Sequence, residues 1–458
     1  MTDFQLEREI AQLPREALGA PRPERPGNFA ARTWRANRDI LGNAGSLFAT
    51  SIMTSALGFT FWALAARLFS PHAVGFGSAA IAAMSVLSTI GTFGLNTLLI
   101  GELPNRKSKG GLIWAALLAT GAGSLVLGLA FALLAPLVSR NFADITGDPE
   151  QLVVVVTGIA VVSVMMVFDD ATIGLMRGQL QLWRNFIFVL AKLLLLPVAA
   201  WGLQDKFGAG IVFSWTAGAA ISLGVLAIQR VVARQPVFRR PDWGVLRGLG
   251  GLTLTHNWLN LALVIPWMLL PVLVTITVGP DANAAYYAAW MVASFLRIIP
   301  QSLSTVLFAV ASGDEEALLP KLRFSLRTST LLGVPGVVVL CLGAPLILGL
   351  FGASYARTGV ISLILLSLSY LPSITKYHYI AVCRATGNIR RAAVVLTGTG
   401  FLLVVAAVCG GKLGGLTGFG LGVLAACVIE GIITSPRVIS AAMRRPGQDV
   451  ARSLDIGC

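Results

Sequence analysis

Charged residues are scarce in this chain, and acidic residues are the scarcer kind. Only 12% of the 458 residues are charged, whereas soluble domains average about 25%. Hydrophobic residues make up 55% of the chain, and they come in runs of about 20, the length a helix needs to cross a bilayer. The composition therefore excludes an ordinary soluble domain and predicts an all-α, polytopic membrane protein.

Cysteine frameworks and catalytic motifs are also lacking. The chain has five cysteines: Cys341, Cys383, Cys409, Cys427 and Cys458. Their spacing fits neither a zinc site nor a disulfide framework. No phosphate-binding GxxxxGK[ST] motif and no HExxH motif is present. The pair Asp169-Asp170 resembles the aspartates that hold magnesium in prenyl transfer, but no second acidic cluster accompanies it.

The connecting loops are short as well. The longest predicted outer loop, "SRNFADITGDPEQ", is too small for an outer catalytic domain. We therefore predict a transporter and not an enzyme, with no metal and no cofactor. A proton or a sodium ion is the candidate coupling ion.

Apolar runs predict twelve membrane helices. They lie near residues 43–68, 74–101, 111–138, 151–175, 184–203, 209–230, 250–278, 284–311, 328–351, 357–382, 390–410 and 414–438. Residues 1–42 have no short apolar core of a signal peptide, and we predict a basic, mostly disordered tail. Residues 43–230 and 250–440 then form two six-helix lobes, joined by the basic linker 231–249 and followed by the tail 441–458.

Basic residues indicate the orientation in the membrane. If the N-terminus is cytoplasmic, 27 of the 35 Lys and Arg residues lie in inner segments. This asymmetry follows the positive-inside rule, so both termini and the linker are predicted to be cytoplasmic. The net charge of +14 thus records orientation and does not indicate nucleic-acid binding. Three cations, Lys192, Arg297 and Lys376, fall inside predicted helices, and we expect Lys376 to extend to the inner interface.

The two halves of the chain repeat. The loop after the fourth helix reads "MRGQLQLWRN" and the loop after the tenth reads "CRATGNIRRA", so Arg177 and Arg184 recur as Arg384 and Arg391 at an offset of 207 residues. Because each half has an even number of crossings, the halves are parallel, and such repeats bind substrate between them near the midplane. The alternative is that arginines recur at inner loops through the positive-inside rule alone.

Arg297 lies deep in the apolar stretch "AAYYAAWMVASFLRIIPQSLSTVLFAVAS". At 1.5 Å per residue it is about 20 Å along its helix. A charge at that depth costs at least about 2.5–3.5 kcal/mol, so the guanidinium needs water, an acid or an anionic ligand, and its planar fork suits phosphate. Two interpretations stay open: contact with a substrate phosphate, or pairing with a buried acid such as Glu430 or Asp170.

Further polar residues are candidates for substrate binding. They are Lys192 in the first half, Asn43 and Thr50 on the first helix, and His256, Asn257 and Asn260 on the seventh. The first and seventh helices occupy equivalent places in the two halves. The alternative is that hydroxyls bond to their own backbone and that His256 has a packing role.

Three acids, Asp169, Asp170 and Glu430, fall in the inner half of predicted helices. Buried carboxylates of this kind can bind a proton or a sodium ion and so couple transport to an ion gradient. They can equally be fixed partners of basic side chains.

Several segments resemble one family. "LAARLFSPHAVGFGSAA", "FGLNTLLIGELPNRK" and the helix around Arg297 are similar to segments of the polysaccharide and lipid-linked oligosaccharide flippases of the multidrug/oligosaccharidyl-lipid/polysaccharide exporter superfamily. The resemblance implies two six-helix lobes around a central cavity that opens to each side in turn. It also implies the bacterial cytoplasmic membrane, a lipid-linked glycan as substrate, and other glycan-assembly membrane proteins as candidate partners.

In relatives that move lipid-linked glycans, cations lining the cavity meet the phosphates of the substrate. This chain departs from some of them, because its clear deep cations are only Arg297 in the second lobe and Lys192 in the first. The alternative on the same fold is a drug or metabolite antiporter, which an acid-rich cavity would favour. Arg297 favours the flippase.

Overall fold

The computed structural model describes residues 57–106, 109–138, 147–175, 177–203, 208–233, 238–244, 250–311 and 315–443. Within these ranges the chain forms helices and no strands, which confirms the predicted all-α class. The first lobe contains α4 (Pro71–Gly91), α5 (Leu95–Glu102), the 3₁₀ helix η2 (Leu103–Asn105), α6 (Gly110–Val138), α8 (Pro149–Gly174), α9 (Gly178–Leu203) and α10 (Ala209–Val232). The second contains α12 (Gly250–Thr277), α13 (Pro280–Ala311), α14 (Glu315–Gly349), α15 (Ala353–Leu368), α16 (Tyr370–Ala385) and α17 (Ile389–Met443).

Ten helices in the described ranges are long and apolar enough to cross a membrane. One of them, α17, is two helices merged across a kink at Gly414 and Gly415. A shorter apolar helix, Leu57–Leu68, precedes α4. With α17 counted as two crossings, this series agrees with the twelve predicted helices.

Several helix boundaries differ from the prediction: α9 begins at Gly178 and not near 184, and the predicted helix 357–382 is divided into α15 and α16. The predicted helix 74–101 breaks between α4 and α5, where Phe93 and Gly94 have positive φ angles of 48° and 76°. α14 begins at Glu315 and not near 328, because "EEALLPKLRFSLR" continues the helix beyond the apolar run. An apolar run marks only the part of a helix that lipid or the protein core covers, so charged extensions escape it.

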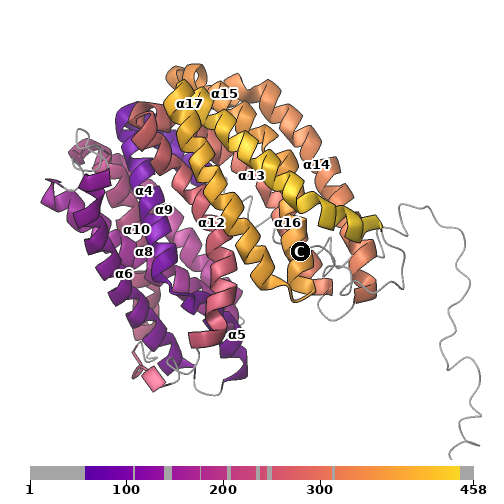
Figure 1. Ribbon diagram of the computed structural model, residues 1–458. Helices are drawn as coiled ribbons and strands as arrows, with labels where there is room; N and C mark the ends of the chain where they lie inside the picture. The colour runs from indigo at the N-terminus through magenta and orange to yellow at the C-terminus, as the bar shows by residue number, and fades with distance from the viewer. Residues whose placement is uncertain are drawn as a thin grey trace, which may run out of the picture.

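The helices form two side-by-side lobes (Figure 1). Lobe 1 comprises the helices from Leu57–Leu68 to α10, and lobe 2 comprises α12 to α17. We call the end where α15 begins and α17 kinks the upper end, and the end that carries α5 the lower end, as drawn in Figure 1.

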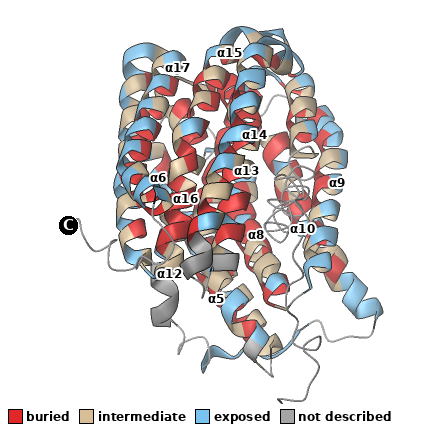
Figure 2. Cartoon of the chain, turned by 90° about the vertical axis from the view of Figure 1, so that its right-hand side faces the viewer, coloured by how far each residue is buried: buried red, intermediate tan, exposed pale blue. Residues whose placement is uncertain are grey.

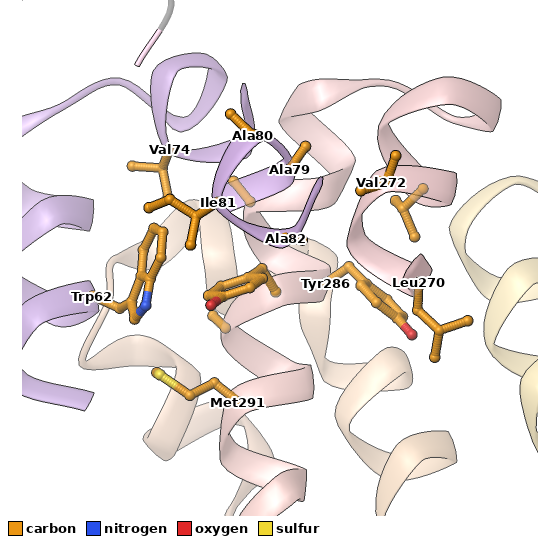
Figure 3. Packing of buried hydrophobic residues seen from close by; sticks show 14 of the residues in the cluster. Trp62, Val74, Ala79, Ala80, Ile81, Ala82, Leu270, Val272, Tyr286 and Met291 are labelled. Atoms are coloured by element: carbon orange, nitrogen blue, oxygen red, sulfur yellow. The ribbon is translucent and has the colours of Figure 1, made fainter. Parts of the chain in front are cut away.

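The lobes contact each other closely near the upper end. Asn283 donates hydrogen bonds from Nδ2 to the carbonyl oxygen of Gly75 at 2.9 Å and to Oγ of Ser78 at 3.0 Å. The backbones approach so closely that a Cβ added to Gly75 would lie 1.8 Å from the carbonyl oxygen of Pro280. One apolar cluster includes residues of both lobes. Figure 3 shows Trp62 of lobe 1 and Tyr286 of lobe 2 in this cluster.

Large apolar side chains cover much of the outer surface. Leu137, Trp201, Leu346 and Leu413 are each more than 80% exposed in the isolated chain, and exposed segments follow the outer faces of the bundle (Figure 2). Helices whose outer faces are apolar while their inner faces are packed are those of a protein surrounded by lipid. The long helices therefore cross the membrane.

Candidate functional site

Arg297 points into lobe 2 from α13. Its side chain is only 8% exposed, and its guanidinium carbon lies 4.2 Å from the ring centre of Trp267 on α12. The stack covers one face of the guanidinium, but Nη1 has no hydrogen-bond partner among the described residues. None of the ion pairs between described residues includes Arg297.

Lys376 and Glu430 form an ion pair beside Arg297. The Nζ atom of Lys376 lies 3.2 Å from Oε2 of Glu430, and Thr399 donates a hydrogen bond of 2.7 Å to Oε1. Lys376 is only 5% exposed, so the expectation that it extends to the inner interface is wrong. The carboxylate of Glu430 gives the ammonium a partner inside the lobe, which removes the need to reach water.

These side chains make one cluster from several helices. Trp267 comes from α12, Arg297 from α13, Lys376 from α16, and Thr399 and Glu430 from the two halves of α17. The ring centre of Trp267 lies 4.2 Å from the guanidinium carbon of Arg297 and 5.9 Å from Nζ of Lys376. Glu430 is paired with Lys376, so Arg297 gives the cluster an excess positive charge and an unused guanidinium donor. Such a site can take up an anion.

Lys192 has different surroundings in lobe 1. It lies on α9 and is 3% exposed. Its Nζ atom is 4.7 Å from the ring centres of Phe61 and Phe188 and 3.9 Å from that of Trp215. Close packing permits this arrangement, because a Cβ on Gly218 of α10 would lie 3.0 Å from Cβ of Lys192. Three aromatic rings thus surround the ammonium.

Asp169 and Asp170 sit at the end of α8 and have separate partners. Arg184 donates two hydrogen bonds to the carboxylate of Asp169, at 2.5 and 2.7 Å. The side chain of Asn96 on α5 is hydrogen-bonded to Asp170. Asp170 takes part in none of the ion pairs between described residues, so it differs from Asp169 and Glu430 in having no basic partner there.

The other predicted residues are dispersed. Asn257 on α12 is 8% exposed. Asn260 accepts a hydrogen bond of 2.9 Å from Arg384 and donates a long one of 3.4 Å to Thr97 of lobe 1. Asn43 and Thr50 lie outside the described residues, as does the side chain of His256.

Sequence reasoning missed the aromatic and hydroxyl members of both groups. The repeat could have linked Lys376 with Asp169, because Lys376 stands 207 residues after it, the same offset that relates the paired arginines. Phe188 and Lys192 are four residues apart on one helix face, a spacing from which a contact between the ring and the ammonium could have been predicted. Nothing in the sequence alone connected Trp267 with Arg297 or Thr399 with Glu430.

The sequence matches one protein family over more than half of its length. A family described as "Polysaccharide biosynthesis protein" matches residues 40–312. The chain belongs to this family. A comparison with curated proteins gives no significant match.

Solved transporter structures share the fold. An inward-facing multidrug resistance MATE family transporter of the MOP superfamily has a TM-score of 0.59 and 15% identity, over 88% of this chain and 98% of that chain. An outward-facing structure of such a transporter gives 0.57 and 14%, over 89% and 97%. A MOP superfamily transporter from Pyrococcus furiosus Vc1, with a binding pocket described as reversed in polarity, gives 0.56 and 13%, over 89% and 97%.

Family and fold together identify a membrane protein of a polysaccharide biosynthesis family that shares its fold with transporters. At identities of 13–15% the structures establish only the fold, whereas the family match connects the chain with polysaccharide biosynthesis and a glycan-type substrate. The apolar helices make it a multi-pass membrane protein whose surroundings are the lipid bilayer.

Proposed function

We propose that the protein moves a lipid-linked oligosaccharide or polysaccharide precursor across the bacterial cytoplasmic membrane by alternating access of its two lobes. It carries out no covalent chemistry on the glycan. The precursor is made on the cytoplasmic face and used outside, so membrane proteins of glycan assembly are its candidate partners.

The observation that carries this proposal is the excess positive charge of the lobe 2 cluster. A phosphate that links glycan to lipid is an anion in a site of low dielectric constant, where charge-assisted hydrogen bonds are strongest. Arg297 has a free Nη1, and α12 and α13, which carry Trp267 and Arg297, also pack against α4 of lobe 1. Two of the helices that carry the cluster therefore also contact lobe 1, which supports access to the cluster for a substrate that lies between the lobes.

Orientation and coupling are part of the proposal. The excess of Lys and Arg in one set of loops supports cytoplasmic termini and a cytoplasmic location for the lower end of Figure 1. Since basic side chains hold Asp169 and Glu430, we assign proton or sodium coupling to Asp170. Asp170→Asn should then abolish transport driven by an ion gradient while substrate exchange without a gradient continues.

A drug or metabolite antiporter is the second candidate, because multidrug resistance transporters share the fold. An antiporter of organic cations needs an unpaired acid to attract them. Asp170 is the described acid that satisfies this requirement, but the lobe 2 cluster has the opposite charge.

Flipping in proteoliposomes distinguishes the two candidates. The purified protein should move a fluorescent polyprenyl-diphosphate saccharide between leaflets and should not move an organic cation such as ethidium in exchange for protons. A shape-matched polyprenyl saccharide without phosphate is the control and should stay in its leaflet. Ethidium exchange without movement of the diphosphate lipid would reject the flippase and support the antiporter.

A further inference from the structure

The surroundings of Lys192 have the geometry of a binding site for an organic cation. Three aromatic rings, of Phe61, Phe188 and Trp215, lie with their centres 3.9–4.7 Å from its Nζ atom. Aromatic cages of this kind recognise alkylammonium groups, because the negative faces of the rings attract the cation and replace part of its hydration. In this protein the cage holds an ammonium that belongs to the chain itself.

Aromatic rings, and not acids, surround this cation. None of the ion pairs between described residues includes Lys192. A charged pair nearby in lobe 1, Arg184 and Asp169, does not include Lys192. The guanidinium carbon of Arg184 lies 5.9 Å from the ring centre of Phe188, one of the three rings around Lys192. The attraction of the rings for a cation is therefore the feature that suits these surroundings to a positive charge.

Aromatic contacts connect the cage with the lobe interface. The ring of Trp62 lies 6.4 Å from that of Trp215 and 4.5 Å from that of Tyr287 on α13 of lobe 2. Tyr287 in turn stacks on Trp290 at 5.5 Å. A single ring, that of Trp62, thus separates the cage from the contact between the lobes, where a transported molecule would pass.

We propose that this cage, formed by Phe61, Phe188 and Trp215, is an organic-cation site that Lys192 occupies as a tethered ligand, and that Lys192 thereby keeps alkylammonium compounds out of lobe 1. Lys192 is a specificity-determining residue in this account: it fills the cage and makes no contact with the anionic part of a substrate. Removing the side chain should open the cage to an external cation.

The first test measures binding of choline to the full-length protein in nanodiscs by calorimetry. Its neutral counterpart, 3,3-dimethylbutan-1-ol, has nearly the same shape without the charge. Lys192→Ala should bind choline about ten-fold more tightly than the alcohol, and about ten-fold more tightly than the unchanged protein does. The proposal would be overturned if folded Lys192→Ala bound choline and the alcohol equally. It would also be overturned if the unchanged protein bound choline as tightly as Lys192→Ala does.

Lys192→Met is the matched control, because its unbranched side chain fills the cage without a charge. It should bind neither compound measurably. Choline binding by Lys192→Met at the level of Lys192→Ala would mean that the cation binds elsewhere, and would overturn the proposal.

A second measurement does not depend on the folding of Lys192→Ala. Trp215→Leu removes one wall of the cage, and its effect on the midpoint of thermal unfolding is measured with Lys192 present and in the Lys192→Met background. The midpoint should fall further when Lys192 is present, because a ring that faces a cation is lost. Equal shifts in both backgrounds would show that the ring contributes packing alone, which contradicts a cation site.

The cage around Lys192 is independent of the proposed transport of a lipid-linked glycan. If Lys192→Ala binds choline but the protein does not flip the diphosphate lipid, only the transport proposal is rejected. If the protein flips the lipid normally but Lys192→Ala does not bind choline, only the cage proposal is rejected.

Discussion

The two lobes repeat one helix arrangement but bury their charges in different ways. In lobe 1 aromatic rings enclose Lys192. In lobe 2 the carboxylate of Glu430 pairs with Lys376 and accepts a hydrogen bond from the hydroxyl of Thr399. Arg297 stacks on Trp267, and its Nη1 has no hydrogen-bond partner among the described residues. Nη1 of Arg184 in lobe 1 also lacks a hydrogen-bond partner, but Arg184 is paired with Asp169. Arg297 has no carboxylate partner in the ion pairs between described residues, so we assign the contact with an anion to lobe 2.

Two side chains at equivalent positions of the predicted repeat carry opposite charges. Asp169 of lobe 1 and Lys376 of lobe 2 are 207 residues apart, yet the first pairs with Arg184 and the second with Glu430. In the predicted repeat the inner arginines recur at the same offset, whereas the charged residues inside the two lobes differ.

The largest effect is expected from removing the acid of lobe 2. Glu430→Leu leaves two buried cations without a carboxylate, and the free energy of unfolding should fall by about 3–5 kcal/mol. Steric trapping in bilayers measures this quantity. The double variant with Lys376→Met should recover most of the loss, because no unpaired ammonium remains. An unchanged stability of Glu430→Leu would show that the pair is not buried as described.

A smaller effect is expected for the acid of lobe 1. Asp169→Asn weakens two hydrogen bonds from Arg184, but the carboxylate is 16% exposed and Asn185 also accepts from Arg184. The free energy of unfolding should fall by about 1.5–3 kcal/mol. Measured by the same method, a loss larger than that of Glu430→Leu would reverse the comparison between the lobes.

One added methyl group should weaken the contact between the lobes at the upper end. Gly75→Ala places a Cβ against the carbonyl oxygen of Pro280, so the contact should weaken by about 1–3 kcal/mol. Distances between spin labels at positions 72 and 281 should lengthen in a larger fraction of molecules. Gly101→Ala is the control, because its Cβ meets nothing within 4 Å. An unchanged distance distribution for Gly75→Ala would contradict closure at this point.

The smallest effect concerns the ion pair across the upper end. His72 and Asp281 meet at 3.0 Å, but their side chains are 46% and 70% exposed. Water and salt screen such a pair, so His72→Ala should change the interaction between the lobes by less than about 1 kcal/mol. Spin labels at the exposed positions 70 and 354 should report a smaller shift for His72→Ala than for Gly75→Ala. A larger shift would make this pair, and not the close backbone contact, the main link.

Sequence alone predicted the order of the membrane crossings well. Each apolar run has the length that the bilayer requires, and "GGKLGG" correctly divided the last two helices near Gly414. The break between α4 and α5 was missed, although Phe93 and Gly94 lie in the glycine-bearing stretch "IGTFGLN". Helix ends depend on local backbone conformation, which hydrophobicity does not report.

The candidate site was predicted less completely. Depth along a helix identified Arg297 and Lys192 as buried cations, because hydrophobic neighbours in sequence are enough to show that. Which partner each cation meets depends on packing between helices distant in sequence. Glu430 was therefore considered as a partner for Arg297, although Lys376 occupies it.

Transport by an Arg297→Ala variant tests the central claim most directly. The flipping rate of a polyprenyl-diphosphate saccharide in proteoliposomes is measured together with the midpoint of thermal unfolding. Because the free Nη1 is the proposed anion contact, the rate should fall roughly thirty-fold or more, while the midpoint changes little. Arg297→Lys should retain part of the rate, because it keeps the charge and loses the planar fork. A stable Arg297→Ala protein that flips the lipid at the normal rate would contradict the account.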